Sequence, residues 1–162
     1  MIWFTSDTHF GHQNILKYTD RPFSSVEEMD EALIENWNNR VGDDDEIYHL
    51  GDVALCSPNK LRKVLARLKG KIYLIRGNHD KSASACSDRF EWIKDYYELE
   101  VADKNGYQGK QLIILFHYLF LGFILSRSRI LFRISKMSSV LVLYTSPQKF
   151  IALIGYSRTK LN

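Results

Sequence analysis

The sequence predicts an α/β protein in which helices pack against a layered sheet. Residues 1–118 alternate short β-prone runs with segments whose apolar residues recur every three or four positions, and this order is typical of that class. A length of 162 residues suits one domain with its own core. The hydrophobic share of 45% and the charged share of 25% exclude a disordered, collagen-like or coiled-coil chain.

Three β-prone runs in the first half are expected to form strands, and each is followed by polar residues. These runs are 2–5, 46–50 and 71–75. Two later strands are expected at 96–102 and 111–117, joined by a Lys-Asn-Gly turn at 104–106.

Two amphipathic helices are expected between the first three strands. Ser24 and Ser25 stand three residues before Glu27 and Glu28, which gives two possible capping boxes at the start of a helix over 26–41, stopped by Gly42. A second helix begins after Ser57 with Pro58 in its first turn, and Gly70 follows its end. The apolar positions of both segments recur at three- and four-residue steps, so each helix presents one face to the core.

The two cysteines, Cys56 and Cys86, exclude a disulfide scaffold and a paired Cys-x-x-Cys zinc site. This cysteine usage favours a reduced compartment. The first seven residues contain no basic segment and already include Asp7, so we expect no signal peptide and a cytoplasmic protein.

The charge is distributed unevenly, and this predicts a boundary at Leu119. Residues 1–118 contain all 19 acidic residues and 15 of the 22 Lys and Arg, a net charge of −4. Residues 119–162 contain the other seven basic residues and no acid, a net charge of +7. We therefore predict a core over 1–118 and an aberrant basic and apolar tail over 119–162, less regular and less well packed than the core.

Residue types that bind metals follow the predicted strands directly. Asp7 and His9 follow the first strand, Asp52 the second, Asn78 the third, and His117 ends the last. In open α/β sheets, ligands bind where the carboxyl ends of strands meet, so we expect these five side chains to converge. Carboxylate, imidazole and amide donors suit Mn, Fe or Zn. Each motif alone has a common structural explanation, such as a capped loop or a turn, and only the ordered combination points to a metal site.

These motifs give the chain its resemblance to a known family. The segments Ser-Asp-Thr-His-Phe-Gly-His at 6–12, His-Leu-Gly-Asp-Val at 49–53 and Arg-Gly-Asn-His-Asp at 76–80 resemble those of calcineurin-like metallophosphoesterases, in particular the small bacterial and phage members. The resemblance covers about 1–118. It implies a four-layer α/β/β/α sandwich, incomplete here at the C-terminus, with a two-metal site that hydrolyses phosphomonoesters or phosphodiesters.

The resemblance also implies a role for each site residue. Asp7 and His9 would hold one metal ion, Asn78 and His117 the other, and Asp52 would bridge both. His79 would face the leaving group, as a histidine able to protonate it. Two further residues, His12 and Arg76, are candidates for phosphate contacts, although a structural role is favoured for both. His49, inside a strand, is expected to lie in the core or behind the ligands.

The family pattern breaks after His117. No histidine follows it, so the Gly-His-x-His motif that supplies one further ligand to each metal is absent from these 162 residues. His117-Tyr118 is followed by Leu119 where the family has proline. We interpret the tail as the product of a frameshift or of gene decay just after His117. The hypothesis fails if no neighbouring reading frame of the locus encodes the missing motif.

Three functions follow from these observations. The chain is an active phosphoesterase, an impaired or inactive remnant of one, or a membrane-associated or interaction protein that uses its tail. The apolar run at 112–125 is 14 residues long, short of the roughly 20 that span a bilayer, which disfavours a membrane partner. The expected partner is a phosphoester substrate, with nucleotides and nucleic acids among the candidates. The sequence does not determine the oligomeric state, the substrate or the metal.

Overall fold

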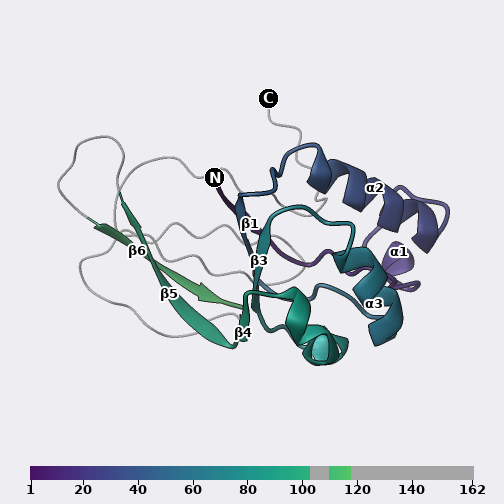
Figure 1. Ribbon diagram of the computed structural model, residues 1–162. Helices are drawn as coiled ribbons and strands as arrows, with labels where there is room; N and C mark the ends of the chain where they lie inside the picture. The colour runs from purple at the N-terminus through teal and green to yellow at the C-terminus, as the bar shows by residue number, and fades with distance from the viewer. Residues whose placement is uncertain (103–109, 118–162) are drawn as a thin grey trace.

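A computed structural model describes residues 1–102 and 110–117, and a parallel sheet forms the centre of this part (Figure 1). Its strands are β1 (Ile2–Thr5), β2 (Glu46–His49), β3 (Lys71–Ile75) and β4 (Trp92–Lys94), which lie side by side in chain order. The register pairs Phe4 with Tyr48, and Tyr48 with Tyr73. Because every pair is parallel, the four carboxyl ends lie at one edge of the sheet.

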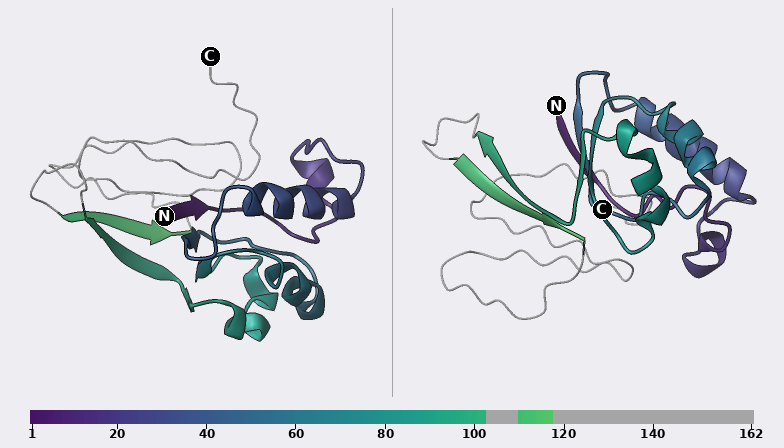
Figure 2. Two further views of the ribbon diagram at one scale, coloured as in Figure 1. Left: turned by 45° about the horizontal axis from the view of Figure 1, so that its top comes forward. Right: turned by 60° about the horizontal axis from the view of Figure 1, so that its bottom comes forward.

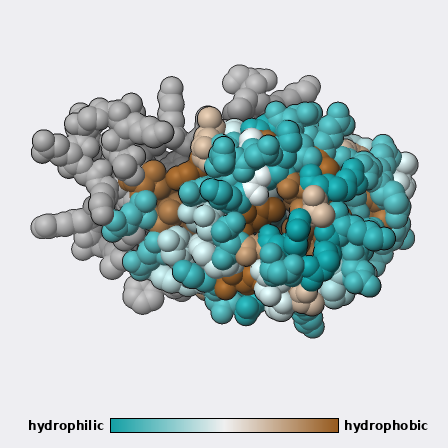
Figure 3. Space-filling view, viewed as in Figure 1, coloured by the Kyte–Doolittle hydropathy of each residue, from teal (hydrophilic) through white to brown (hydrophobic). Residues whose placement is uncertain are grey.

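Helices cover one face of this sheet. They are α1 (Ile15–Tyr18), α2 (Val26–Asn38) and α3 (Pro58–Leu65), and two 3₁₀ helices, η1 (Asp80–Ser82) and η2 (Ser84–Arg89), follow β3 (Figure 1). Of the two candidate caps of α2, Ser25 is the N-cap, and its hydroxyl accepts from the amide of Glu28. α3 begins after Ser57 as predicted, and the Ser57 hydroxyl accepts from the amide of Lys60. Leu61 of α3 is fully buried, and burial of a side chain of this size stabilises the fold by roughly 1.5–3 kcal/mol. The surface over α2 and α3 is mainly hydrophilic (Figure 3).

A second, two-stranded sheet packs on the other face of the parallel sheet. Strands β5 (Tyr96–Ala102) and β6 (Lys110–Phe116) form an antiparallel pair, and Figure 2 shows them on the side away from the helices. Ile47 and Leu74 pack toward the helices, whereas Tyr48 and Ile75 pack toward β5 and β6. Side chains alternate between faces along a strand, so β2 and β3 are buried on both sides.

The described residues therefore form three layers, α/β/β, and the mixed α/β fold with a parallel sheet is confirmed. The fourth layer of the expected sandwich lies outside the described residues. So do the predicted turn at 104–106 and the predicted tail at 119–162, and the boundary at Leu119 stays a prediction.

Several local expectations need correction. The helix predicted over 26–41 ends at Asn38, and the chain continues in a turn where the amides of Arg40 and Val41 both donate to the carbonyl of Trp37. Val41 is nevertheless buried, which explains why it matched the helical pattern. No sequence pattern predicted α1, β4 or the two 3₁₀ helices, because each has at most six residues and too few positions for a periodic pattern.

Within the described part of the chain, no helix has the length and apolar character needed to cross a membrane. The first residues of the apolar run at 112–125 belong to β6, where they pair with β5. The rest of that run lies outside the described residues.

Candidate metal centre

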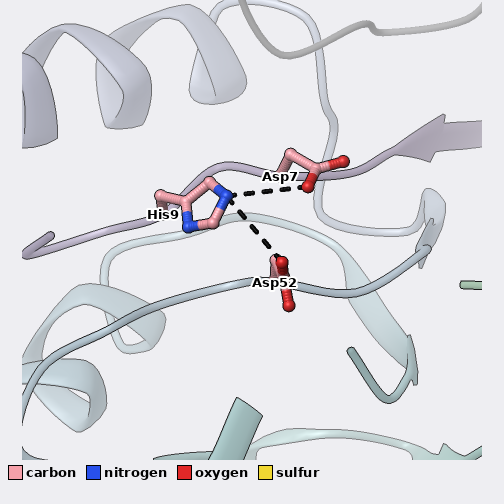
Figure 4. A group of neighbouring side chains, drawn as sticks. All are labelled: Asp7, His9 and Asp52. Carbon is pink, nitrogen blue, oxygen red and sulfur yellow. Dashed lines mark ion pairs between the residues drawn. The ribbon is translucent and has the colours of Figure 1, made fainter. Parts of the chain in front are cut away.

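Two loops that leave adjacent strands bring the first three candidate ligands together. The loop after β1 lies along the loop after β2: the amides of Asp7, His9 and Phe10 donate to the carbonyls of residues 51, 52 and 53 over 2.9, 3.0 and 2.8 Å. As a result, Nε2 of His9 lies 3.6 Å from Oδ1 of Asp7 and 3.9 Å from Oδ2 of Asp52 (Figure 4). The three ligand atoms all lie within 4.8 Å of one another.

This geometry fits a cation. Distances of 3.6 and 3.9 Å are too long for hydrogen bonds but close to the roughly 3.4 Å that separates two ligands of one ion at bond lengths near 2.1 Å. The side chains of His9 and Asp52 are nearly inaccessible to solvent, and buried carboxylates require a compensating positive charge. Asp7, His9 and Asp52 therefore form a candidate metal site.

The backbone at these three positions is strained. Asp7, His9 and Asp52 have φ angles of 56°, 54° and 57°, in the left-handed region that side chains other than glycine rarely adopt. Each costs of order 1–3 kcal/mol and persists only where surrounding contacts hold it. Strain at all three candidate ligands, and at only one other non-glycine residue of the described part, indicates that the site's geometry has been favoured over local stability.

A second group of electron-pair donors lies on the other side of Asp52. His117 at the end of β6 places Nδ1 2.8 Å from the carbonyl oxygen of Leu50, and Nε2 3.2 Å from Oδ1 of Asn78 and 3.7 Å from Oδ1 of Asp52. A carbonyl oxygen only accepts, so Nδ1 donates to Leu50, and Nε2 is the ring nitrogen that faces the other two oxygens. Three donors that face one point are typical of a metal site with a hydrogen-bonded histidine ligand.

The Asp52 carboxylate belongs to both groups, with Oδ2 near His9 and Oδ1 near His117. The expected convergence of Asp7, His9, Asp52, Asn78 and His117 is thus observed. One premise was wrong: His117 arrives from the antiparallel β5–β6 pair and not from a strand of the parallel sheet.

Two glycines make the close approach possible. A Cβ at Gly51, where φ is +98°, would lie 2.2 Å from Nδ1 of His117. A Cβ at Gly77 would lie 2.3 Å from Oδ1 of Asp52. Any larger residue at either position would displace a candidate ligand.

The remaining site histidines line the same region. The amide of His79 donates to Oδ1 of Asp52 over 2.9 Å, and its half-buried ring stands edge-on to that of His9, with centroids 5.5 Å apart. His12 is buried, and its Nδ1 lies 3.3 Å from Nδ1 of His9. Burial and then the neighbouring rings of His9 and His79 lower the pKa of His12. Arg76 is exposed and pairs with Asp95 over 3.3 Å.

Three supporting residues lie behind the candidate ligands. Asp80 is buried, and its carboxylate accepts hydrogen bonds from the amides of Asp52, Val53 and Gly77 over 2.7–2.9 Å. Burial raises the pKa of Asp80, and these amide hydrogen bonds oppose the rise. Asp80 belongs to a sequence motif, but no sequence pattern predicts its role, because none shows that its side chain turns toward the loop after β2.

The other two supporting residues are His49 and Thr8. Nε2 of His49 lies 3.0 Å from the Thr8 hydroxyl, which itself donates to the carbonyl of Val53. The single hydroxyl hydrogen is thus used, so His49 donates to Thr8 through Nε2. Burial lowers the pKa of His49 to about 3. The prediction that His49 lies in the core or behind the ligands is confirmed.

Comparison with known proteins agrees with this geometry. The calcineurin-like phosphoesterase family model matches residues 1–146. The chain belongs to the calcineurin-like phosphoesterase family. The match runs past the composition boundary at Leu119.

Relatives of this chain include archaeal and phage proteins. An uncharacterized protein, MJ1445, of Methanocaldococcus jannaschii is 56% identical over 82 residues, 49% of this chain and 47% of that protein. The gene 66 proteins of mycobacteriophages L5 and D29 are 33% and 31% identical over 98 and 134 residues. These alignments cover 59% and 75% of this chain. They cover 47% and 65% of the two phage proteins, so the chain spans between about half and two thirds of its relatives' lengths.

A solved structure shows a related fold. The crystal structure of AQ665, a protein of unknown function from Aquifex aeolicus, superimposes with a TM-score of 0.59 and 28% identity. The superposition covers 78% of this chain and 65% of AQ665. The family is named for phosphoester hydrolysis, and Asp7, His9 and Asp52 form a candidate metal site in this chain.

Proposed function

We propose that the protein is a two-metal phosphoesterase that hydrolyses a phosphomonoester or phosphodiester. The observation that carries the proposal is the position of Asp52, whose two carboxylate oxygens face separate donor groups. A carboxylate that bridges two ions about 3.5–4 Å apart is a recurring feature of phosphate-transfer sites. When bound, such ions polarise the phosphoryl oxygens and make hydroxide available near neutral pH. Mn, Fe and Zn all suit these donors.

The proposed roles divide the residues by position. Asp7 and His9 hold one ion with Asp52, and Asn78 and His117 hold the other with Asp52. His79 donates a proton to the leaving group, a role supported by its half-buried ring beside His9 and by the bond from its amide to Asp52.

His12 and Arg76 are proposed as phosphate contacts on weaker grounds. The ring of His12 stands 5.2 Å from that of His9 and 5.8 Å from that of His79, close enough to meet a bound phosphate. Arg76 would have to leave Asp95 to do so. Exposed ion pairs contribute little stability, so this exchange has a low cost.

The missing Gly-His-x-His motif supports a second proposal, that this polypeptide is an impaired or inactive remnant. Each proposed ion retains three protein ligands, a number that holds zinc in catalytic sites, but the two ions share one of the three. We therefore expect weak metal binding and low or no activity. The substrate class, including nucleotides and nucleic acids, the cytoplasmic location and any role of the tail remain part of the proposal.

The test is hydrolysis of bis(p-nitrophenyl) phosphate with added manganese, comparing the chain with His79→Ala. Lys81→Ala, an exposed neighbour, serves as the matched control. We expect His79→Ala to lower kcat by about 100-fold or more with unchanged manganese binding, since general acids contribute roughly 10²–10⁴-fold. If the unaltered chain has measurable turnover, equal activity of His79→Ala contradicts the role of His79. Turnover by the unaltered chain at about 1–1000 per second contradicts the remnant. Absence of both manganese binding and hydrolysis supports it.

A further inference from the structure

Arg21, in the segment between α1 and α2, contacts the ligand-bearing loop from the side opposite β2. Its guanidinium donates from Nη2 to the carbonyl of Asp7 over 2.8 Å and from Nη1 to the carbonyl of Thr8 over 2.9 Å. Nη1 also lies 3.2 Å from the sulfur of Met29 in α2. One side chain thus binds two successive carbonyls of the loop that carries Asp7 and His9.

The two carbonyls lie where the backbone is strained. Asp7 and His9 adopt left-handed φ angles. Within a trans peptide group the C=O and the N–H point in opposite directions, so the Thr8 carbonyl points away from the group that the His9 amide contacts. The amides of Asp7 and His9 donate to the β2 loop, so their hydrogen bonds hold one side of the segment. The carbonyls point the other way, and Arg21 satisfies them. In the described part of the chain, no other side chain bonds to both of these carbonyls.

The far end of the same loop is held by Asp30 of α2. The buried Asp30 accepts from the amide of Gly11 through Oδ1 over 2.9 Å and pairs through Oδ2 with Lys60 over 3.2 Å. Gly11 packs closely against the segment leading into α3, since a Cβ there would lie 2.6 Å from Cβ of Cys56. The loop is therefore fixed at its end by Asp30 and at its strained centre by Arg21.

We propose that Arg21 is a positioning residue: it holds the Asp7–His9 segment in its left-handed conformation before a cation arrives. The expected effect on metal affinity rests on the proposed function, whereas the positioning itself is a property of the metal-free chain. Loss of outer contacts to metal ligands commonly costs 10–100-fold in affinity, and we expect a loss of that size for Mn²⁺. The planar guanidinium reaches two carbonyls at once, which an ammonium does not, so lysine restores the charge and not the geometry.

The experiment compares the full-length chain with Arg21→Met, Arg21→Lys and the control Arg40→Met. Arg40 also donates to a backbone carbonyl, that of Asn36, but on the exposed surface of α2. Amide hydrogen exchange is measured first, without metal. We expect the amides of His9 and Phe10 to exchange at least 10-fold faster in Arg21→Met while those of β3 are unchanged, and no change in Arg40→Met. Arg21→Lys should lie near Arg21→Met. Unchanged exchange at His9 and Phe10 overturns the inference, and a uniform increase that includes β3 reduces Arg21 to a general stabiliser and also overturns it.

Mn²⁺ binding is then followed by electron paramagnetic resonance of the free ion. A 10–100-fold weaker affinity in Arg21→Met supports the inference. Equal or tighter binding overturns the consequence for metal binding, because removing the positive charge of Arg21 would then offset or outweigh the loss of its contacts. If the unaltered chain binds no Mn²⁺, the two-metal proposal fails, and the exchange measurements still decide whether Arg21 positions the loop.

Discussion

The buried histidine behind the ligands makes the stability of the protein dependent on pH. Burial holds the pKa of His49 at about 3, against 6.5 for an ordinary histidine, so the ring is neutral in the folded protein and takes up a proton on unfolding below pH 6.5. A lowered folded-state pKa means that stability is complete above pH 6.5 and decreases as the pH falls. Since pH 5 lies 1.5 units below the unfolded-state pKa, protonation of His49 in the unfolded chain lowers the free energy of unfolding by about 2 kcal/mol at this pH. The value hardly depends on whether the folded pKa is 3 or 4.

The test replaces His49 with glutamine, which does not titrate and offers an amide hydrogen to the Thr8 hydroxyl in place of Nε2–H. The free energy of unfolding is measured by urea denaturation of the metal-free chain and of His49→Gln at pH 7.5 and pH 5. We expect the unaltered chain to lose about 2 kcal/mol more than His49→Gln between these two values. The comparison removes the contribution of other groups, such as His12, that both chains share. A difference below about 0.5 kcal/mol would show that His49 is not held neutral, and would refute the reasoning.

Two further predictions concern the loops that carry Asp52. Asp80→Ala leaves three backbone amides without their acceptor and should lower the free energy of unfolding by about 3–5 kcal/mol, measured by urea denaturation; Asp88→Ala, which removes only an exposed ion pair, should have little effect, and equal losses in the two variants would contradict this account. Gly77→Ala brings a methyl group to 2.3 Å from Oδ1 of Asp52 and should abolish the rise in melting temperature that Mn²⁺ causes, whereas Gly42→Ala, whose methyl has ordinary contacts of 3.7 Å or more, should retain it. Retention of the manganese effect by Gly77→Ala would count against Asp52 as a ligand.

Local chemistry explains which parts of the fold could be read in advance. The runs that form β2 and β3 are buried on both faces, and the run that forms β1 is partly buried. Ser25 and Ser57 cap their helices through contacts within three residues. Such signals are contained in short stretches of sequence. β4 has only three residues and becomes a strand because β3 offers it an edge, which no local pattern encodes.

The candidate site divides in the same way. The sequence alone determined which residue types follow the strands, and it thereby determined Asp7, His9, Asp52, Asn78 and His117 as candidate ligands, because donors of that kind in that order are rarely combined for another purpose. Only the tertiary structure decided that Asp52 faces both donor groups and that His117 reaches it from the second sheet.

The supporting contacts were also beyond the sequence. Asp80 lies 28 residues from Asp52, His49 lies 41 from Thr8, and Arg21 lies 14 from Asp7, yet each pair is in hydrogen-bond contact. A hydrogen bond needs a donor and an acceptor about 3 Å apart in a set orientation, and the packing of helices and loops on the sheet provides both. The sequence therefore determined the chemistry available to this protein, and the tertiary structure decided how that chemistry is positioned, because only packing brings distant backbone and side-chain groups within bonding distance.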